Sequence, residues 1–156
     1  MKTRRFQASD MNQIVSLFYE TVHSVNGRDY SQEQLDAWAP RDEQALKLKA
    51  WEASMSRNVT YVAEADGVIT GFSDMTSEGH LDRLYVHKDY QRQGIASALV
   101  DSLEEEARRL GLVEIDVEAS ITAKPFFEKM GYRVLESQVV ERRGVKLANY
   151  KMIKSL

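Results

Sequence analysis

Residues 81–110, LDRLYVHKDYQRQGIASALVDSLEEEARRL, constrain the fold of this 156-residue chain more than any other stretch. They open with a short alternating run that ends in Leu84-Tyr85-Val86, as is typical of a partly buried strand. A polar turn containing Gly94 follows, and from Ile95 onward apolar residues recur at the spacing of one helix face. The segment therefore predicts a strand, a glycine-bearing loop and an amphipathic helix in succession.

The start of this predicted helix suits an anionic ligand. The first turn of a helix leaves backbone N–H groups unpaired, and the aligned peptide dipoles place partial positive charge there. Gly94 has no Cβ, so a phosphate can approach its amide closely, and the small side chains of Ala96 and Ser97 keep the turn open. Arg92 can add a cationic side chain, so the loop predicts a phosphate-binding site.

These residues resemble a known family. Gln91-Arg92-Gln93-Gly94-Ile95-Ala96 is similar to the Gln/Arg-x-x-Gly-x-Gly/Ala acyl-CoA signature of the GNAT superfamily of N-acetyltransferases. Residues 123–134, AKPFFEKMGYRV, resemble the Ala-x-x-Phe-Tyr-x-x-x-Gly-Phe segment of the same family. The resemblance spans about residues 61–153. It implies an acetyl-CoA-dependent N-acetyltransferase that acts on a primary amine of a small molecule or peptide.

The composition of the chain excludes several other classes of protein and of site. The chain has no cysteine, which removes disulfides and a cysteine nucleophile and fits a reducing compartment. Its formal charge is −3, and no dense Lys/Arg stripe is present, so we expect no nucleic-acid partner. No run of about 18 apolar residues occurs, so we expect no membrane association. We predict one cytoplasmic N-acetyltransferase domain over residues 1–156 that uses no metal.

The rest of the pattern predicts an α+β fold with a mixed sheet. Asp66-Gly67 separates two β-rich runs and signals a hairpin, and residues 142–144 join a second antiparallel pair. The resemblance adds a mostly antiparallel central sheet of seven strands, flanked by helices and splayed near the fourth and fifth strands. The expected strands are 4–8, 60–65, 68–75, 81–86, 113–117, 132–140 and 145–153, and the expected helices are 11–23, 31–40, 42–56, 95–110 and 123–130.

Finer expectations concern caps and strand faces. Ser9 or Asp10 can cap the helix that begins near Met11. In the strand from Val113 to Val117, the aliphatic residues at 113, 115 and 117 should point inward. Strict alternation in the central strand would place residues 80, 82 and 84 on one side and residues 81, 83 and 85 on the other.

The resemblance also assigns an acyl-CoA site. The pantetheine amides would pair with the backbone of the central strand, and the pyrophosphate would lie over residues 92–97. The residues that we expect to contact acyl-CoA are Leu84, Tyr85, Val86, Gln91, Arg92, Gln93, Gly94, Ile95, Ala96, Ser97, Phe126 and Phe127.

The sequence motifs indicate the acceptor-binding and catalytic residues less directly than they indicate the acyl-CoA site. Tyr30 and Trp38 lie in a region that the family places over the acceptor site, although Trp38 also suits a core position. A carboxylate or imidazole must remove a proton from the attacking amine, and Asp82 and His80 stand where many family members place that base. Both residues also suit the solvated start of a strand. Glu118 is a third, weaker candidate.

The family's Phe-Tyr pair, whose tyrosine usually protonates the leaving thiolate, is here Phe126-Phe127. Phenylalanine cannot donate a proton, so Tyr85, Ser120, Tyr132 or water would replace the tyrosine, with Tyr85 our first choice. The departure also leaves open a non-catalytic acyl-CoA sensor or interaction module. Many family members pair through terminal strands, so a homodimer is an alternative to a monomer.

Overall fold

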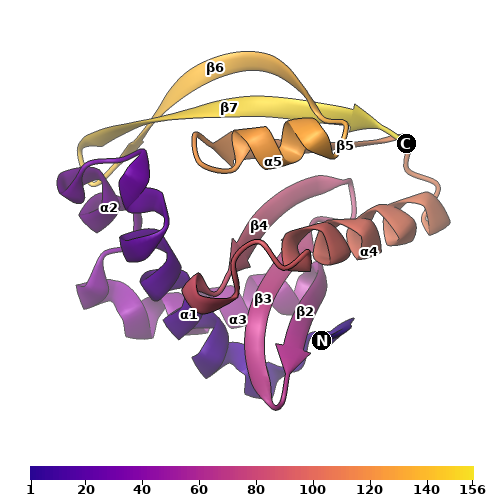
Figure 1. The fold of residues 1–156 in the computed structure, drawn as a ribbon, viewed down its shortest axis with the longest axis horizontal. Helices are drawn as coiled ribbons and strands as arrows, with labels where there is room; N and C mark the ends of the chain where they lie inside the picture. Colours follow the sequence, from indigo (N-terminus) through magenta and orange to yellow (C-terminus); the bar gives the residue numbers. More distant parts are fainter.

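A computed structural model describes all 156 residues and contains a seven-stranded sheet in the order β1-β2-β3-β4-β5-β7-β6 (Figure 1). Every neighbouring pair is antiparallel except β4 and β5, which run parallel. The expected α+β fold with a largely antiparallel sheet is confirmed. The strands are β1 (Lys2–Arg5), β2 (Val59–Ala65), β3 (Val68–Met75), β4 (His80–Val86), β5 (Glu114–Ser120), β6 (Arg133–Arg142) and β7 (Val145–Ser155).

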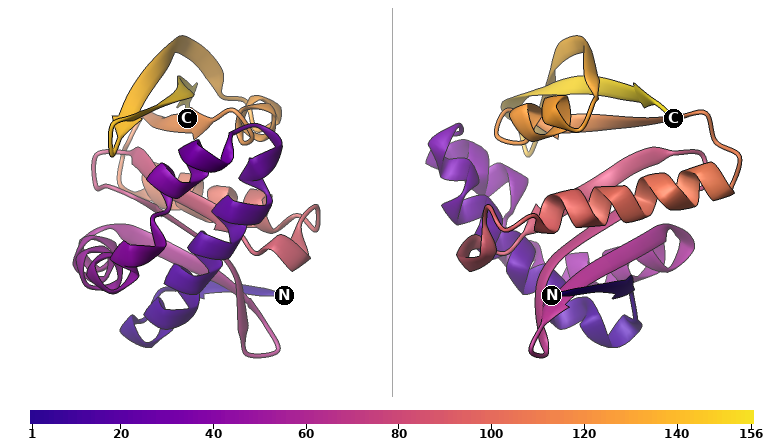
Figure 2. Two further views of the ribbon diagram at one scale, coloured as in Figure 1. Left: turned by 90° about the vertical axis from the view of Figure 1, so that its left-hand side faces the viewer. Right: turned by 45° about the vertical axis from the view of Figure 1, so that its right-hand side comes forward.

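The helices cover both faces of the sheet, as Figures 1 and 2 show. On one face, α1 and α3 bury an aromatic cluster in which the partly buried Trp51 contacts both Phe18 and Phe72. On the other face, α4 buries Leu99 and Leu103, and α5 buries Phe127. The helices are α1 (Met11–Ser24), α2 (Gln32–Trp38), α3 (Gln44–Arg57), α4 (Ile95–Arg109) and α5 (Lys124–Lys129). No helix is both long and apolar enough to cross a membrane.

Two tight turns have the backbone that their sequences predict. Asp66 and Gly67 adopt φ of 52° and 79° between β2 and β3, and Arg143 and Gly144 adopt 50° and 78° between β6 and β7. Positive φ at both central residues is what a two-residue hairpin needs to match the twist of its strands. Both predicted hairpins are confirmed.

The boundaries of two elements differ from expectation. The first strand ends at Arg5 and not at Ala8, because a 3-10 turn over Ala8–Asp10 leads directly into α1. Val113 was expected to point inward but is 75% exposed, because β5 begins only at Glu114 and the carbonyl of Val113 instead accepts a bond from Leu156 at 2.8 Å.

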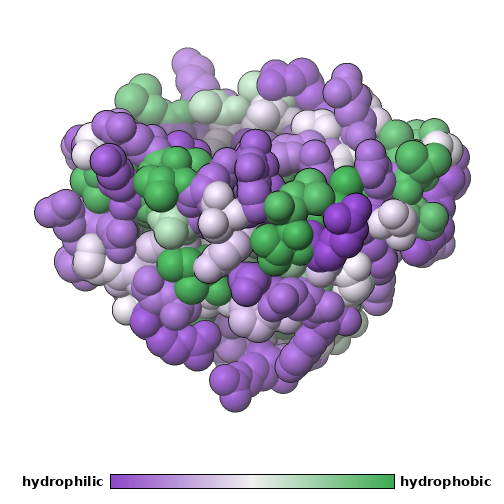
Figure 3. Space-filling view, turned by 90° about the horizontal axis from the view of Figure 1, so that it is seen from above, coloured by the Kyte–Doolittle hydropathy of each residue, from purple (hydrophilic) through white to green (hydrophobic).

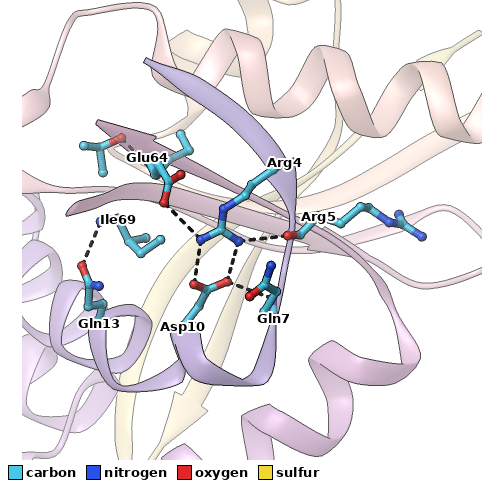
Figure 4. A network of polar contacts seen from close by, with 9 residues as sticks. Arg4, Arg5, Gln7, Asp10, Gln13, Glu64 and Ile69 are labelled. Carbon is cyan, nitrogen blue, oxygen red and sulfur yellow. Dashed lines mark hydrogen bonds and ion pairs between the residues drawn. The ribbon is translucent and has the colours of Figure 1, made fainter. Parts of the chain in front are cut away.

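Asp10 does not cap α1 through its side chain, contrary to one of the two expected caps. Its carboxylate accepts two hydrogen bonds of 2.9 Å from Arg4 and one of 2.8 Å from the Gln7 amide, and Arg4 also reaches Glu64 at 3.2 Å (Figure 4). Burial alone would raise the pKa of Asp10, but these bonds outweigh it and the pKa is lowered. The network therefore ties β1 to α1 and β2.

We expect Asp10→Asn to lower the free energy of unfolding by about 1–3 kcal/mol at pH 7, because Arg4 loses one of its two carboxylate partners, the one that accepts two of its hydrogen bonds. A lowered folded-state pKa stabilises above the unfolded pKa, and that contribution is lost as the pH falls through the folded value. The deficit should therefore shrink below about pH 4. Urea unfolding at several pH values measures it. Asp42→Asn, which removes an exposed partner of Arg143, is the control and should change the free energy of unfolding little. If Asp10→Asn lost the same free energy of unfolding at pH 3 as at pH 7, the charged Asp10 carboxylate would not be the source of the stability.

The sheet opens between its fourth and fifth strands. β4 and β5 share only two register pairs, His80 with Asp116 and Leu81 with Val117. Beyond Leu81 the two strands separate, so the β1–β4 half and the β5–β7 half diverge (Figure 2). The predicted splay is confirmed, and it leaves one edge of β4 open.

The face above β6 and β7 carries scattered apolar patches among polar side chains (Figure 3). β6 forms the edge of the sheet, and Leu135 and Val139 on it are 52% and 64% exposed. A homodimer through this edge stays a prediction.

Candidate active site

The loop before α4 leaves backbone amides without partners. Arg92 and Gly94 adopt φ of 60° and 77°, and the first helical bond runs from the Ala98 amide to the Gly94 carbonyl at 3.1 Å. The amides of residues 95–97 therefore begin the helix with no acceptor in the chain. With the helix dipole they make this end electropositive, which suits a phosphate.

Two contacts fix this loop in place. The Gln91 side chain donates to the carbonyls of Val86 at 2.7 Å and His87 at 3.3 Å, which holds the loop against the end of β4. Gly71 on β3 lets α4 lie close to the sheet, because a Cβ there would stand 2.8 Å from the Ile95 side chain. The packing thus positions the start of α4 beside the open edge of β4.

A cleft of about 460 Å³ follows that open edge. It runs from the start of α4, past the end of β4, to the half-buried ring of Phe126 and to the more deeply buried Phe127 on α5. Of the twelve residues expected to contact acyl-CoA, all but Gln93 line this cleft.

The open edge of β4 offers polar backbone groups from alternate residues. The His87 amide and the Arg83 carbonyl are bonded to Thr70 and Ser73 of β3, so the groups of Leu84 and Val86 point to the open side. The Val86 carbonyl is already taken, by Thr21 at 3.0 Å and by Gln91. The groups left for an extended ligand are the two amides and the Leu84 carbonyl, while Tyr85 meets the cleft through its side chain.

A second cleft of about 270 Å³ joins the first. Its walls come from α2 and the segment before it, from β4 and β5, and from the β6–β7 hairpin, and they include Tyr30, His80, Arg142 and Asn149. The residues that line both clefts mark the junction between them, and they are Trp38, Leu81, Asp82, Tyr85, Glu118 and Ser120.

A β-bulge places Asp82 at this junction and corrects the expected alternation of β4. Asp74 pairs with Arg83 and Met75 with Leu81, so Asp82 is an extra residue in the register. As a result Leu81 packs with the α4 and α5 core, whereas Arg83 stacks on Trp51 of α3. Strict alternation had placed Leu81 and Arg83 on the same side, which is wrong.

His80 and Glu118 reach the second cleft from neighbouring strands. His80 Nδ1 lies 2.7 Å from Asp116 Oδ1, an ion pair if the imidazole is protonated. Glu118 accepts a bond of 3.0 Å from Gln138 on β6. His80 does not line the larger cleft, so Asp82 and Glu118 are the carboxylates that face both clefts.

Arg83 holds the bulge from behind. Its guanidinium bonds to Asp74 and to Ser54 Oγ at 2.7 Å, stacks 4.7 Å from the centre of the Trp51 ring, and lies 3.6 Å from Asp82 Oδ2. Asp74 is fully buried, and burial raises its pKa although Arg83 and Asn58 act against that. A buried charged pair thus anchors the strand that carries Asp82.

Tyr30 and Trp38 form one aromatic wall, with ring centres 5.3 Å apart. The Tyr30 hydroxyl donates to the Ala148 carbonyl at 2.6 Å and accepts from the Ile121 amide at 2.9 Å, so it joins the α2 region to β7 and β5. Its hydroxyl is therefore occupied, and its ring lines the smaller cleft. Trp38 lines both clefts.

The candidate proton donors differ in position. Burial raises the pKa of Tyr85 to about 12, with Trp38 acting in the opposite direction. Tyr132 was one alternative, but it is buried, donates to Glu104 at 2.9 Å and lines neither cleft, so the structure contradicts it. Ser120 lines both clefts and accepts from the Ala123 amide at 3.0 Å.

Three residues of the site were not selected from the sequence: Arg83, Arg142 and Asn149. One feature of the sequence marks Arg83: it is a charged residue on the strand face that was expected to carry Leu81 and Tyr85 as well. Arg142 and Asn149 lie in the last hairpin, and their place beside β4 depends on contacts distant in sequence. No group of three His, Asp or Glu side chains is arranged to hold a metal ion.

Comparison with known proteins identifies relatives of this chain by sequence. The family profile described as "Acetyltransferase (GNAT) domain" matches residues 26–154. YafP of Escherichia coli K12, described as an uncharacterized N-acetyltransferase, is 34% identical over 152 residues, which cover 97% of this chain and 94% of that protein.

Two solved structures extend the likeness. A GCN5-related N-acetyltransferase from Rhodopseudomonas palustris has a TM-score of 0.93 at 34% identity, covering 99% of this chain and 95% of the other. The PaiA N-acetyltransferase of Thermoplasma acidophilum, in complex with coenzyme A, has a TM-score of 0.80 at 18% identity, covering 99% and 98%; at that identity the likeness concerns the fold alone.

Proposed function

Because the chain belongs to the GNAT acetyltransferase family, we propose that it transfers the acetyl group of acetyl-CoA to a primary amine by direct attack in a ternary complex. One observation carries this proposal: the larger cleft, which follows the phosphate-suited loop and the open edge of β4, meets a second cleft at Asp82 and Glu118. The thioester and the amine can therefore approach the same point from two sides.

The larger cleft suits acyl-CoA in two parts. The unpartnered amides at the start of α4, with Arg92, would bind the pyrophosphate. The two amides and one carbonyl on the open side of β4 would pair with the pantetheine amides. Phe126 would contact the arm from α5, while the more deeply buried Phe127 supports that ring at a centroid distance of 5.2 Å.

We assign proton removal to Asp82. A primary amine with a pKa near 10.4 is almost wholly protonated at pH 7, so a base must recover roughly 4–5 kcal/mol of apparent barrier. Asp82 faces both clefts, its side chain is 40% exposed, and the Arg83 guanidinium lies 3.6 Å from its carboxylate. Glu118 is the second candidate, because it faces the same junction. His80 lies in the second cleft alone.

We expect Asp82→Asn to lower kcat by about 100-fold, because the amide holds no proton-accepting carboxylate. It should also flatten the acidic side of the dependence of kcat on pH, with little change in acetyl-CoA affinity. Thiol release measured over a range of pH tests this. His80→Gln and Glu118→Gln are the matched variants: a full loss in either one beside a normal Asp82→Asn would move the base to that residue.

The leaving thiolate needs no strong acid in this site. The pKa of Tyr85 is raised to about 12, well above that of a thiol, so Tyr85 keeps its proton and acts at most as a hydrogen-bond donor. The thiolate would leave as such or take a proton from water.

A non-catalytic acyl-CoA sensor is the second candidate, favoured by phenylalanine at position 127. Thermal unfolding with acetyl-CoA, followed by thiol release over a panel of amines, separates the two. Ligand at about 100 times its Kd should stabilise the fold by roughly 2.7 kcal/mol. Stabilisation with thiol release supports the transferase, stabilisation without release for any amine supports the sensor, and no stabilisation overturns both.

A further inference from the structure

The smaller cleft has charges of opposite sign at its two ends. Asp82 and Glu118 lie at the junction with the larger cleft, and Arg142 lies on the β6–β7 hairpin. Register fixes the order along β7, since Glu118 pairs with Lys151 and Arg142 with Val145. These two β7 positions are six residues apart, about 20 Å along an extended strand. The distance between the charged groups of Glu118 and Arg142 can be shorter than this backbone distance, because both side chains are long.

Arg142 has no carboxylate partner. Its only side-chain hydrogen bond goes to the carbonyl of its neighbour Glu141 at 3.1 Å. The adjacent Arg143 differs, because it pairs with Asp42 at 3.0 Å and lines neither cleft. In a chain with three more acidic than basic residues, an unpaired arginine on the wall of a cleft is available to a ligand.

A second cation lies close by. Lys47 on α3 forms no ion pair, and its ammonium rests 5.1 Å from the ring centres of both Phe18 and Trp51. Burial lowers the pKa of Lys47, and the charges of Arg83 and Arg142 lower it further, although Glu43 acts in the opposite direction. Lys47 lines neither cleft, so Arg142 is the arginine or lysine that the wall of the smaller cleft itself presents.

The wall of the smaller cleft between these two ends carries a buried polar atom without a hydrogen-bond partner. Asn149 Oδ1 is buried and accepts no hydrogen bond within the chain. A buried amide oxygen left unpaired costs free energy, so it calls for an N–H or O–H donor from whatever fills the cleft. Around it, Leu147, Val140 and the Tyr30 and Trp38 rings provide apolar contact.

We propose that the acceptor is a primary amine that also carries an anionic group, a carboxylate or a phosphate, separated from the amine by a spacer of several bonds and bound by Arg142. This inference rests on the proposed function, because the amine end is placed by the acetyl-transfer site. The ammonium would enter toward Asp82 and Glu118, and the anion would receive the guanidinium fork of Arg142.

A series of ω-amino carboxylates tests the proposal: glycine, 4-aminobutyrate, 6-aminohexanoate and 8-aminooctanoate, each against the n-alkylamine of the same length. A 6-aminohexyl phosphate arm distinguishes a phosphate from a carboxylate. We expect kcat/KM for thiol release to favour the longer anionic amines over their uncharged partners by at least about tenfold. The preference should persist in Arg143→Gln, the matched control, and disappear in Arg142→Gln.

Binding of the amines is measured separately from acetyl transfer. Thermal unfolding of the three proteins with each amine, in the presence and absence of coenzyme A, should show stabilisation by the anionic amines that depends on Arg142. Equal values for anionic and uncharged amines, or a preference that survives in Arg142→Gln, would overturn the proposal even if acetyl transfer is found. Absence of stabilisation by coenzyme A and of thiol release would instead reject the proposed function, while the Arg142-dependent shift by the amines alone would still decide this inference.

Discussion

Gly94→Glu should abolish acyl-CoA binding and leave the protein folded. The position has φ of 77° and open space around it, with no atom within 4 Å of a Cβ built there. A glutamate would therefore project into the larger cleft without displacing any neighbour, and its carboxylate would face the site proposed for the pyrophosphate. Like charges brought together in a binding site cost several kcal/mol, so we expect about 4 kcal/mol, or roughly a 1000-fold rise in Kd.

Gly67→Glu is the control for backbone strain. Gly67 has φ of 79° and is equally free of neighbours, but it lies in the β2–β3 turn and lines neither cleft. A non-glycine residue at such φ costs roughly 1–2 kcal/mol, so both variants should lose similar stability without ligand. Calorimetric titration with acetyl-CoA should then show normal binding by Gly67→Glu and none by Gly94→Glu; normal binding by both would remove the loop from the acyl-CoA site.

The parts of the fold that sequence predicts well are those determined by neighbouring residues. Asp66-Gly67 demands positive φ at two successive positions, which few conformations other than a tight hairpin allow. The Gly94 loop and the apolar face of α4 likewise depend on local geometry. The short helix headed by Ser31 is confirmed for the same reason, because Ser31 accepts from the Gln34 amide at 3.2 Å and Gln34 bonds back at 2.9 Å.

Features that depend on how strands pair with one another cannot be predicted from local sequence, and the bulge in β4 is the main example. Alternation in β4 fails because Asp82 is inserted in the register opposite β3, and a bulge of one residue reverses the side on which Leu81 points. No local pattern in residues 80–86, HLDRLYV, predicts this bulge. The same bulge brings Asp82 to the junction of the clefts beside Arg83, so the error in the fold and the position of the site have one cause.

Contacts distant in sequence explain the rest of what was missed. Tyr30 stays a predicted acceptor-site residue, but no local pattern shows that its hydroxyl bonds to Ala148 and Ile121, which are 118 and 91 residues away. The pairing of Arg143 with Asp42, across 101 residues, likewise holds the tip of the β6–β7 hairpin against the segment before α3. Arg142 and Asn149 become walls of the smaller cleft because β7 pairs with β5 and with β6, and these pairings join segments that are distant in sequence.

Arg83→Leu should destabilise the protein by about 3–5 kcal/mol, because it leaves the fully buried Asp74 carboxylate without its charged partner. Asp74 would keep one hydrogen bond, from Asn58 at 2.9 Å, and its Oδ1 already has none. Arg143→Leu is the control, since Arg143 pairs with the exposed carboxylate of Asp42, and its removal should change the free energy of unfolding far less.

The dependence of this loss on pH has a definite sign. Burial raises the pKa of Asp74 in the wild type, and removal of Arg83 takes away the charge that most opposes that rise. A raised folded-state pKa gives stability that is fully present below the unfolded pKa and is lost as the pH rises through the folded value. Arg83→Leu should therefore be least destabilised near pH 4 and most destabilised at pH 8, as measured by urea unfolding.

A double variant separates the loss of a packed side chain from the exposure of a buried charge. Asp74→Asn in the Arg83→Leu background removes the unpaired carboxylate, and we expect it to recover at least half of the lost free energy and to abolish the added dependence on pH. Thiol release by the recovered protein then reports on the bulge itself. If Arg83 orients Asp82, kcat stays low in the stable double variant; a stable double variant with wild-type kcat would limit Arg83 to holding α3 against the sheet.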